Sequence, residues 1–121
     1  MTGRLASRDG RGAARRAATA LLAAAAVVGA AAACTRRPPR SHAVAIRSFT
    51  FQPATLTVAL GDTVVWTNED VVPHTATARS GGWDSGSLST RQSWRFVAEA
   101  PGHHQYFCVF HPNMQGAIEV R

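Results

Sequence analysis

The stretch CVFHPNM, residues 108–114, places a thiol, an imidazole and a thioether close together, at Cys108, His111 and Met114. Structural zinc sites are built mainly from cysteine and histidine, and zinc rarely recruits methionine. Methionine is a weak, soft ligand that suits copper, and two histidines, one cysteine and a distant axial methionine form the blue-copper type of site. The stretch therefore predicts a copper centre, for which it supplies three ligands and lacks a second histidine.

The second histidine has to come from elsewhere in the chain, which offers His42, His74, His103 and His104. His74 follows an apolar segment and a loop, so it can lie at the same end of a β-fold as residues 108–114. His103 and His104 are neighbours on a predicted strand, where successive side chains point to opposite faces, so they cannot both turn towards one metal ion. His42 stands at the start of the predicted domain. We therefore expect the copper ligands to be His74, Cys108, His111 and Met114.

Alternating apolar residues predict a series of short strands from His42 onward. In HAVAIRSFTF (42–51) and ATLTVAL (54–60), the side chains expected to face inward are Val44, Ile46, Phe49, Phe51, Leu56, Val58 and Leu60. Further strand-like segments are TVVWTN (63–68), HTATA (74–78), SWRFVAE (93–99), HHQYFCVF (103–110) and GAIEV (116–120). No long helical period appears, and seven or eight short strands separated by turn residues predict a β-sandwich or barrel.

Residues 1–33 have the pattern of an export signal. Arginines precede a run of apolar and small residues at Ala17–Ala33, which only Thr19 interrupts, and Cys34 follows directly. The sequence AAAC resembles a lipobox, so we expect Cys34 to become the lipidated first residue of a protein held at the outer face of the cell membrane or in the periplasm. An uncleaved membrane anchor is the alternative, since the run is about 17 residues long. Residues 34–41 then form a Pro/Arg linker and residues 42–121 a single domain.

The two cysteines allow a second interpretation of residue 108. Exported proteins usually pair their cysteines, so a Cys34–Cys108 disulfide competes with a metal-bound thiol. Such a disulfide would leave the neighbouring His111 and Met114 unexplained. A lone thiol in an oxidising compartment is expected to be buried or bound, which agrees with the copper hypothesis.

The positive charge of the chain lies outside the predicted domain. The whole chain carries a formal net charge of +6, but residues 41–121 contain five arginines against six acidic residues, a net charge of −1. The excess belongs to the export segment and to the linker arginines Arg36, Arg37 and Arg40. The charge therefore does not support binding to nucleic acid.

Over residues 43–121 the chain resembles the cupredoxins of the plastocyanin/amicyanin type. The resemblance is carried by FQPATLTVALGDTVVWTNED from Phe51, PHT at 73–75, WDSG at 83–86, PGHHQYFC at 101–108 and HPNM at 111–114. It implies a Greek-key β-sandwich that binds one type 1 copper ion through His74, Cys108, His111 and Met114. It also implies a monomeric one-electron carrier that meets transient redox partner proteins outside the cytoplasm and is not an enzyme. The turn at Ser89–Gln92 departs from the family by lacking its usual glycine.

Two other functions compete with electron transfer. A protein for copper storage or delivery would expose several methionines and histidines, but the only methionines here are Met1 and Met114. A copper enzyme would need a second cluster of histidines and usually further domains, which argues against that class. For an electron carrier we expect His111 to be the gateway, surrounded by an apolar contact patch of Val71, Val72, Phe110 and Pro112.

Overall fold

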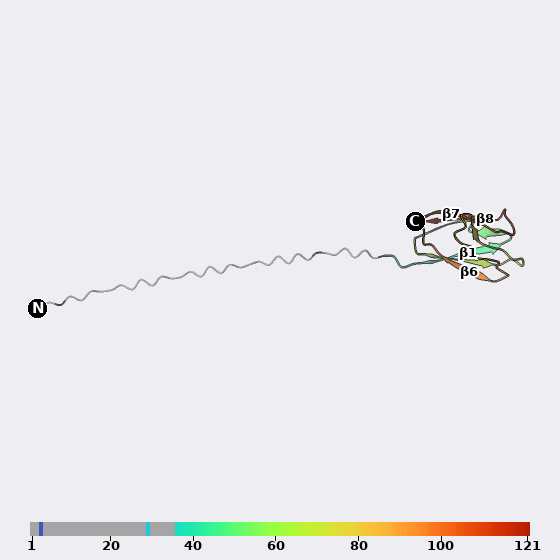
Figure 1. The fold of residues 1–121 in the computed structure, drawn as a ribbon. Coiled ribbons are helices and arrows are strands. Elements are labelled where there is room, and N and C mark those ends of the chain that lie inside the picture. The colour runs from blue at the N-terminus through green and yellow to red at the C-terminus, as the bar shows by residue number, and fades with distance from the viewer. Residues whose placement is uncertain (1–2, 4–28, 30–35) are drawn as a thin grey trace. The chain divides into compact units, whose positions relative to one another are not determined.

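The computed structural model describes residues 3, 29 and 36–121 of the chain, and the fold lies in residues 36–121 (Figure 1). The predicted export segment and the lipid on Cys34 lie outside the described residues. Eight strands follow one another in the order β1 (Ser41–Arg47), β2 (Thr50–Gln52), β3 (Thr55–Val58), β4 (Thr63–Asn68), β5 (Thr77–Ala78), β6 (Ser93–Val97), β7 (Gly102–Phe107) and β8 (Gln115–Val120). Within this part of the chain there is no helix of the length and apolarity that a membrane span requires.

The strands form two four-stranded sheets, which confirms the predicted sandwich rather than a barrel. One sheet has the order β2-β1-β4-β6 and the other the order β3-β8-β7-β5. Strands β1 and β4 run parallel, with Ser41 opposite Thr63 and Ile46 opposite Asn68. Along β4 every second residue is buried, as alternation of apolar and polar residues in a one-side-buried strand requires. Because β1 and β4 end side by side, the loops that follow them lie at one end of the sandwich.

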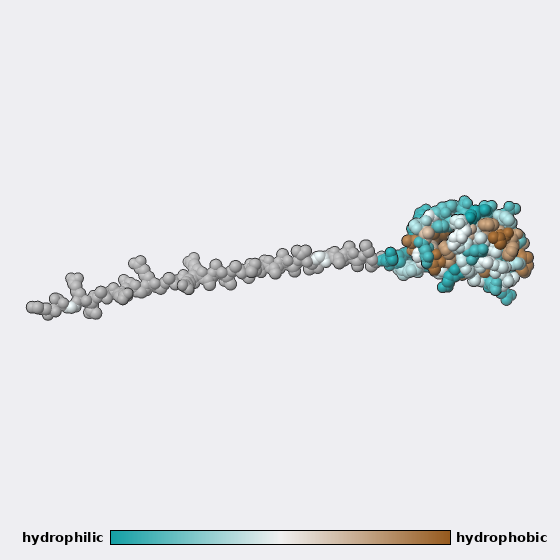
Figure 2. All heavy atoms as spheres, viewed as in Figure 1, coloured by the Kyte–Doolittle hydropathy of each residue, from teal (hydrophilic) through white to brown (hydrophobic). Residues whose placement is uncertain are grey.

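Several large apolar side chains lie on the surface, namely Phe49, Leu60, Val71, Val97, Val109 and Phe110. Figure 2 shows apolar patches among polar residues on the domain, including its end away from residues 36–40. The prediction that Phe49 and Leu60 face inward is wrong, since they are 49% and 53% exposed. Leu60 falls after the end of β3, and Phe49 falls in the turn between β1 and β2, so neither follows the alternation of a strand.

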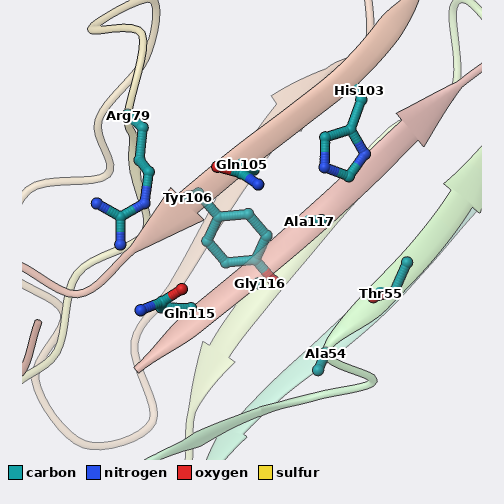
Figure 3. A pocket seen from close by; sticks show the side chains of 9 residues that line it. All are labelled: Ala54, Thr55, Arg79, His103, Gln105, Tyr106, Gln115, Gly116 and Ala117. Atoms are coloured by element: carbon teal, nitrogen blue, oxygen red, sulfur yellow. The ribbon is translucent and has the colours of Figure 1, made fainter. Parts of the chain in front are cut away.

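Strands β7 and β8 pair antiparallel, with Tyr106 opposite Gly116. Beside this pair lies a shallow pocket of about 300 Å³, whose lining includes Arg79 and His103 (Figure 3). The ring of Tyr106 passes over the space that a side chain at position 116 would fill. Gly116 therefore allows a large aromatic residue to enter the sandwich two residues before Cys108.

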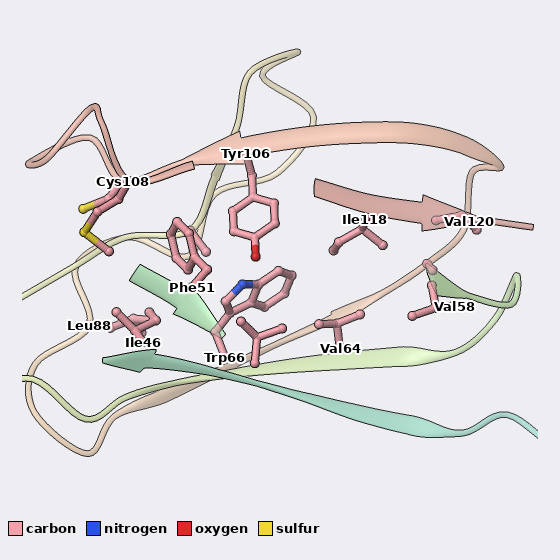
Figure 4. Packing of buried hydrophobic residues seen from close by; sticks show 14 residues of the cluster. Ile46, Phe51, Val58, Val64, Trp66, Leu88, Tyr106, Cys108, Ile118 and Val120 are labelled. Atoms are coloured by element: carbon pink, nitrogen blue, oxygen red, sulfur yellow. The ribbon is translucent and has the colours of Figure 1, made fainter. Parts of the chain in front are cut away.

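The core between the sheets is aromatic at its centre (Figure 4). Tyr106 lies edge-on to Phe51 and Trp66, at ring-centroid distances of 4.6 and 5.4 Å. Trp83 and Trp94 are only partly buried, and both pack against Trp66. Burial raises the pKa of Tyr106 to about 12. Aromatic pairs in these geometries add to the stability that area burial supplies, and they give the metal-binding end a rigid base.

The opposite end of the sandwich is closed by one buried carboxylate. Asp62 accepts hydrogen bonds from the Arg37 guanidinium at 2.9 and 3.0 Å, from the backbone N–H of Arg40 at 2.9 Å and from that of Ala59 at 3.1 Å. The Nε2 atom of His42 lies 2.8 Å from the same carboxylate. The N–H of Arg40 and the contact with His42 hold the pKa of Asp62 far below its usual range, against the effect of burial. Part of the predicted linker is therefore bound to the domain.

Candidate metal centre

Three loops converge at one end of the sandwich. One follows β4 and carries His74, one follows β7 and carries Cys108 and His111, and one is the turn between β1 and β2. The side chains of His74, Cys108 and His111 each offer one ligand atom, and these atoms lie within 4.8 Å of one another. His74 lies 34 residues before Cys108 in the sequence, and the packing of the two sheets brings their side chains together.

The loop after β7 is folded by its own backbone. The N–H of His111 donates to the carbonyl of Cys108 at 3.2 Å, and the N–H of Met114 donates to the carbonyl of His111 at 2.8 Å. The N–H of Cys108 donates in turn to the carbonyl of Met114 at 3.1 Å. These bonds close the loop on itself and bring the Cys108 sulfur to 3.7 Å from Nδ1 of His111. Met114 is buried, with 4% of its surface exposed.

His74 is held in a fixed orientation on both sides. Its backbone exchanges hydrogen bonds with Leu88, at 3.1 and 2.8 Å, and its ring is fully buried. The Nε2 atom lies 2.8 Å from the carboxylate of Asp70. A carboxylate accepts the ring N–H, so Nε2 carries the proton and the lone pair of Nδ1 faces Cys108 Sγ at 3.7 Å.

The carboxylate of Asp70 accepts hydrogen bonds from several N–H groups. Burial alone would raise its pKa, but the backbone N–H groups of Phe49 and Ser48, together with His74, hold the pKa below its usual value. The group therefore stays ionised and keeps accepting the His74 proton. A buried amide supports the same loop, since Asn68 donates to the carbonyls of Val72 and Leu88, at 2.8 Å each, and accepts from the N–H of Asp70 at 2.9 Å.

The sulfur of Cys108 is buried and is a free thiol; Cys34, its partner in the alternative disulfide, lies outside the described residues. The N–H of Thr75 points at Sγ from 3.3 Å, and the Thr75 hydroxyl accepts the N–H of Val109 at 2.9 Å. A backbone N–H aimed at sulfur can donate to a thiolate, which is the form of cysteine that binds metal.

The three ligand atoms have the spacing that a metal ion needs. A first-row metal at about 2.0 Å from nitrogen and about 2.3 Å from sulfur, with about 120° between the bonds, requires a sulfur–nitrogen separation of about 3.7 Å. Cys108 Sγ lies 3.7 Å from Nδ1 of His74 and 3.7 Å from Nδ1 of His111. Both sulfur–nitrogen separations therefore fit a metal ion held by His74, Cys108 and His111, with the soft sulfur of the buried Met114 close in the sequence.

The other histidines lie away from this group. His42 contacts Asp62 at the far end of the sandwich. On the β7–β8 pair, His103 contacts Glu119, and the Nε2–H of His104 donates to the carbonyl of Ala100 at 2.8 Å. Among residues 36–121, His74 is the histidine that joins Cys108 and His111.

The sequence matches the cupredoxin-like domain family over residues 17–120. The chain belongs to the cupredoxin family. It is 32% identical over 88 residues to amicyanin-alpha of Methylorubrum extorquens, a match that covers 69% of this cupredoxin and 74% of that protein. It is also 32% identical over 82 residues to amicyanin of Paracoccus versutus, covering 64% of this chain and 62% of the relative.

Solved structures of cupredoxins are also similar to this chain. A purple cupredoxin from Nitrosopumilus maritimus superimposes with a TM-score of 0.62 at 29% identity, covering 66% of this chain and 99% of that one. A reduced amicyanin variant gives a TM-score of 0.62 at 28% identity, with coverage of 67% and 82%. A copper-containing nitrite reductase from Thermus scotoductus gives 0.63 at 26% identity, but only 23% of that longer chain is covered. The resemblance predicted from the sequence is thus confirmed, and so is the fold.

Four contributors to the site were not predicted from the sequence. They are Asn68 and Asp70 behind His74, the Thr75 hydroxyl that holds the second loop, and Phe49, whose ring contacts both histidines. The segment TNED, residues 67–70, at the end of an apolar strand was the available signal for Asn68 and Asp70. Polar residues at a strand end beside a proposed ligand are candidates for orienting it.

Proposed function

We propose that this cupredoxin carries single electrons through one type 1 copper ion bound by His74, Cys108, His111 and Met114. The observation that carries the proposal is the matched pair of 3.7 Å distances from the buried Cys108 sulfur to the two imidazole nitrogens. Similar solved structures include amicyanin variants in Cu(I) forms, and the soft donor set of this chain fits copper. When bound, copper supplies a one-electron couple between Cu(I) and Cu(II).

The residues of the chain prepare the site for that couple. His74 and Cys108 are fully buried, so water is excluded from most of the site. The Thr75 N–H holds charge on the sulfur, and Asp70 holds the proton of His74 at Nε2. Since each ligand is fixed by bonds to the surrounding backbone, little has to move when the charge of the site changes. An enclosed, rigid site favours electron transfer over copper storage or delivery, for which ligands must be exposed to exchange.

We propose that electrons pass through His111. Its ring is only half-buried, whereas His74 and Cys108 have no exposed surface. Nearby in the sequence, Val109 and Phe110 are 44% and 51% exposed, and Val71 beside the other loop is 90% exposed. An apolar rim suits weak encounters with redox partner proteins, which typically bury less than about 1,200 Å². The predicted contact patch of Val71, Val72, Phe110 and Pro112 is the surface we assign to them.

The setting of this function is also a proposal. Residues 1–33 are assigned to export, residues 34–41 to a linker with a lipidated Cys34, and residues 42–121 to a monomeric copper domain. This places the protein in the periplasm or at the outer face of the cell membrane. The amicyanin relatives support an exported protein, and we propose an electron carrier rather than an enzyme.

Absorption and EPR spectra of the full chain with Cu(II) test the proposal. A thiolate-to-copper band in the visible range, lost in Cys108→Ser, is expected because the thiolate supplies the charge-transfer transition. A Cys108→Ser variant that keeps the colour would contradict the ligand assignment. A site that binds copper without that band, and that exchanges it rapidly with a chelator, would favour storage or delivery instead.

The docking patch is tested separately. Pro112→Glu and Val72→Lys each place a charge on the proposed contact surface and should leave the copper spectrum intact. Slower electron exchange with a redox partner at an unchanged potential is expected. Unchanged exchange in both variants would mean that electrons leave by another route.

A further inference from the structure

The turn between β1 and β2 has an unusual backbone for its sequence. Arg47 pairs with Thr50, so Ser48 and Phe49 form a two-residue hairpin loop. Both have positive φ angles, 51° and 57°, as the two central residues of a type I′ turn require. Asn-Gly or Asp-Gly is the usual sequence there, and a bulky residue with positive φ is a genuine outlier. Such strain persists where the surrounding structure enforces it, often beside a functional site.

The ring of Phe49 is what this strained turn presents. It meets the ring of His74 edge-on at 5.3 Å and 88°, and the ring of His111 edge-on at 4.9 Å and 87°. Phe49 therefore touches both imidazoles, while 49% of its own surface remains exposed. Together with His111, Pro112 and Met114 it lines a shallow cavity of about 300 Å³ at this end of the domain.

One carboxylate holds the turn against the site. Asp70 accepts the N–H of Ser48 at 2.7 Å and the N–H of Phe49 at 3.0 Å. The same carboxylate contacts Nε2 of His74 at 2.8 Å. The backbone of the turn and the proton of a buried histidine therefore share one anchor, so the position of the Phe49 ring is tied to the position of His74.

We propose that Phe49 is a positioning residue of the metal centre, which braces the imidazoles of His74 and His111 and shields the site from water. A hairpin selected for stability alone would carry glycine at this position. Phe49 gives up that stability and places an aromatic ring over two ligand side chains. The part of this inference that concerns copper rests on the function proposed above, whereas the ordering of the two imidazoles concerns the copper-free protein as well.

A comparison of Phe49→Gly with Ser48→Gly separates the effect of losing the Phe49 ring from the effect of changing the turn. Both substitutions relieve a positive φ angle, and both keep the backbone N–H groups that bind Asp70, but only the first removes the ring. We expect Phe49→Gly to release copper to a chelator about tenfold faster than the parent chain, since two aromatic contacts are lost. Ser48→Gly should release copper at the parental rate, and Phe49→Leu should fall between the two glycine variants because it shields without the edge-to-face contacts.

NMR spectra of the copper-free full chain supply the second readout. We expect sharp, ring-current-shifted imidazole signals for His74 and His111 in the parent and in Ser48→Gly, and displaced or broadened signals in Phe49→Gly. Parental release rates and parental imidazole signals in Phe49→Gly would overturn the inference, and so would equally fast release from Ser48→Gly. If the parent chain binds no copper, the proposed function fails, while the imidazole signals still decide whether Phe49 orders the two rings.

Discussion

Replacing Gly116 by alanine should destabilise the domain through a single steric conflict. A Cβ atom at position 116 would lie 2.3 Å from Cζ, 2.4 Å from Oη and 2.7 Å from Cε1 of Tyr106, within the arrangement that Figure 3 shows. These separations are far below van der Waals contact, so the ring has to move. Tyr106 is only 1% exposed and lies against Phe51 and Trp66, which leaves it no free space.

The cost can be put at about 1–3 kcal/mol, the usual range for forcing an extra carbon into a packed core. For a domain of this size, each kcal/mol lowers Tm by about 4–8 °C, so a cost of about 2 kcal/mol corresponds to about 8–16 °C. Thermal and urea unfolding of the copper-free chain, followed by circular dichroism, measures this directly. Because Tyr106 lies near the end of β7, two residues before Cys108, the copper spectrum should also broaden or shift.

Gly82→Ala is the matched control. Its added Cβ would meet only the Ser80 hydroxyl, at 3.6 Å, which is ordinary contact. We expect its unfolding free energy to stay within about 0.5 kcal/mol of the parent. If Gly116→Ala unfolded at the same temperature as Gly82→Ala, the Tyr106 ring could not be packed as described, and the account of the aromatic core would be wrong.

Three further outcomes are expected. Met114→Leu should keep a copper site and raise its reduction potential, because loss of a weak axial donor favours Cu(I); voltammetry that gave an equal or lower potential would argue against axial ligation. Asp62→Asn should lower stability at neutral pH: the pKa of Asp62 is depressed on folding, so its contribution is present above its ordinary pKa of 3.8 and is lost as the pH falls below it. Acid titration should therefore show a shallower loss of stability in Asp62→Asn than in the parent. Mass spectrometry of the native protein should find a diacylglyceryl group on Cys34, and a mature chain beginning with unmodified Cys34 would leave a soluble carrier.

The ligand-bearing loop could be predicted because its information is local. Cys108, His111 and Met114 are close in the sequence, and the choice of copper follows from their chemistry alone. His74 could be selected because strand periodicity places its loop at the end of an apolar segment. The strands could likewise be predicted from alternation, which gave Val44, Ile46 and Phe51 as buried residues.

The surroundings of the ligands depend on contacts that periodicity does not encode. Phe49 shares the alternation of Phe51 in β2, which led to an inward prediction, but it lies in the turn that precedes this strand and its ring emerges over the site. The role of Asp70 requires knowing that this turn lies beside the loop after β4, a consequence of the parallel β1–β4 pair. At Arg91 the chain adopts a positive φ of 66° without glycine, so the absence of glycine from the Ser89–Gln92 turn did not prevent its formation.

Strand β4 places the contact with the linker and the metal centre at opposite ends of the domain. Asp62 stands at the start of β4, and Asn68 and the loop to His74 stand at its end, about 20 Å away at 3.3 Å per residue. Because Asp62 binds Arg37 and the backbone of Arg40, part of the predicted linker, residues 34–41, is held against this end of the domain. A lipid on Cys34 would therefore hold the Asp62 end of the sandwich close to the membrane. The half-buried His111 and its apolar rim, at the other end, would then remain accessible to proteins that approach from outside the membrane surface.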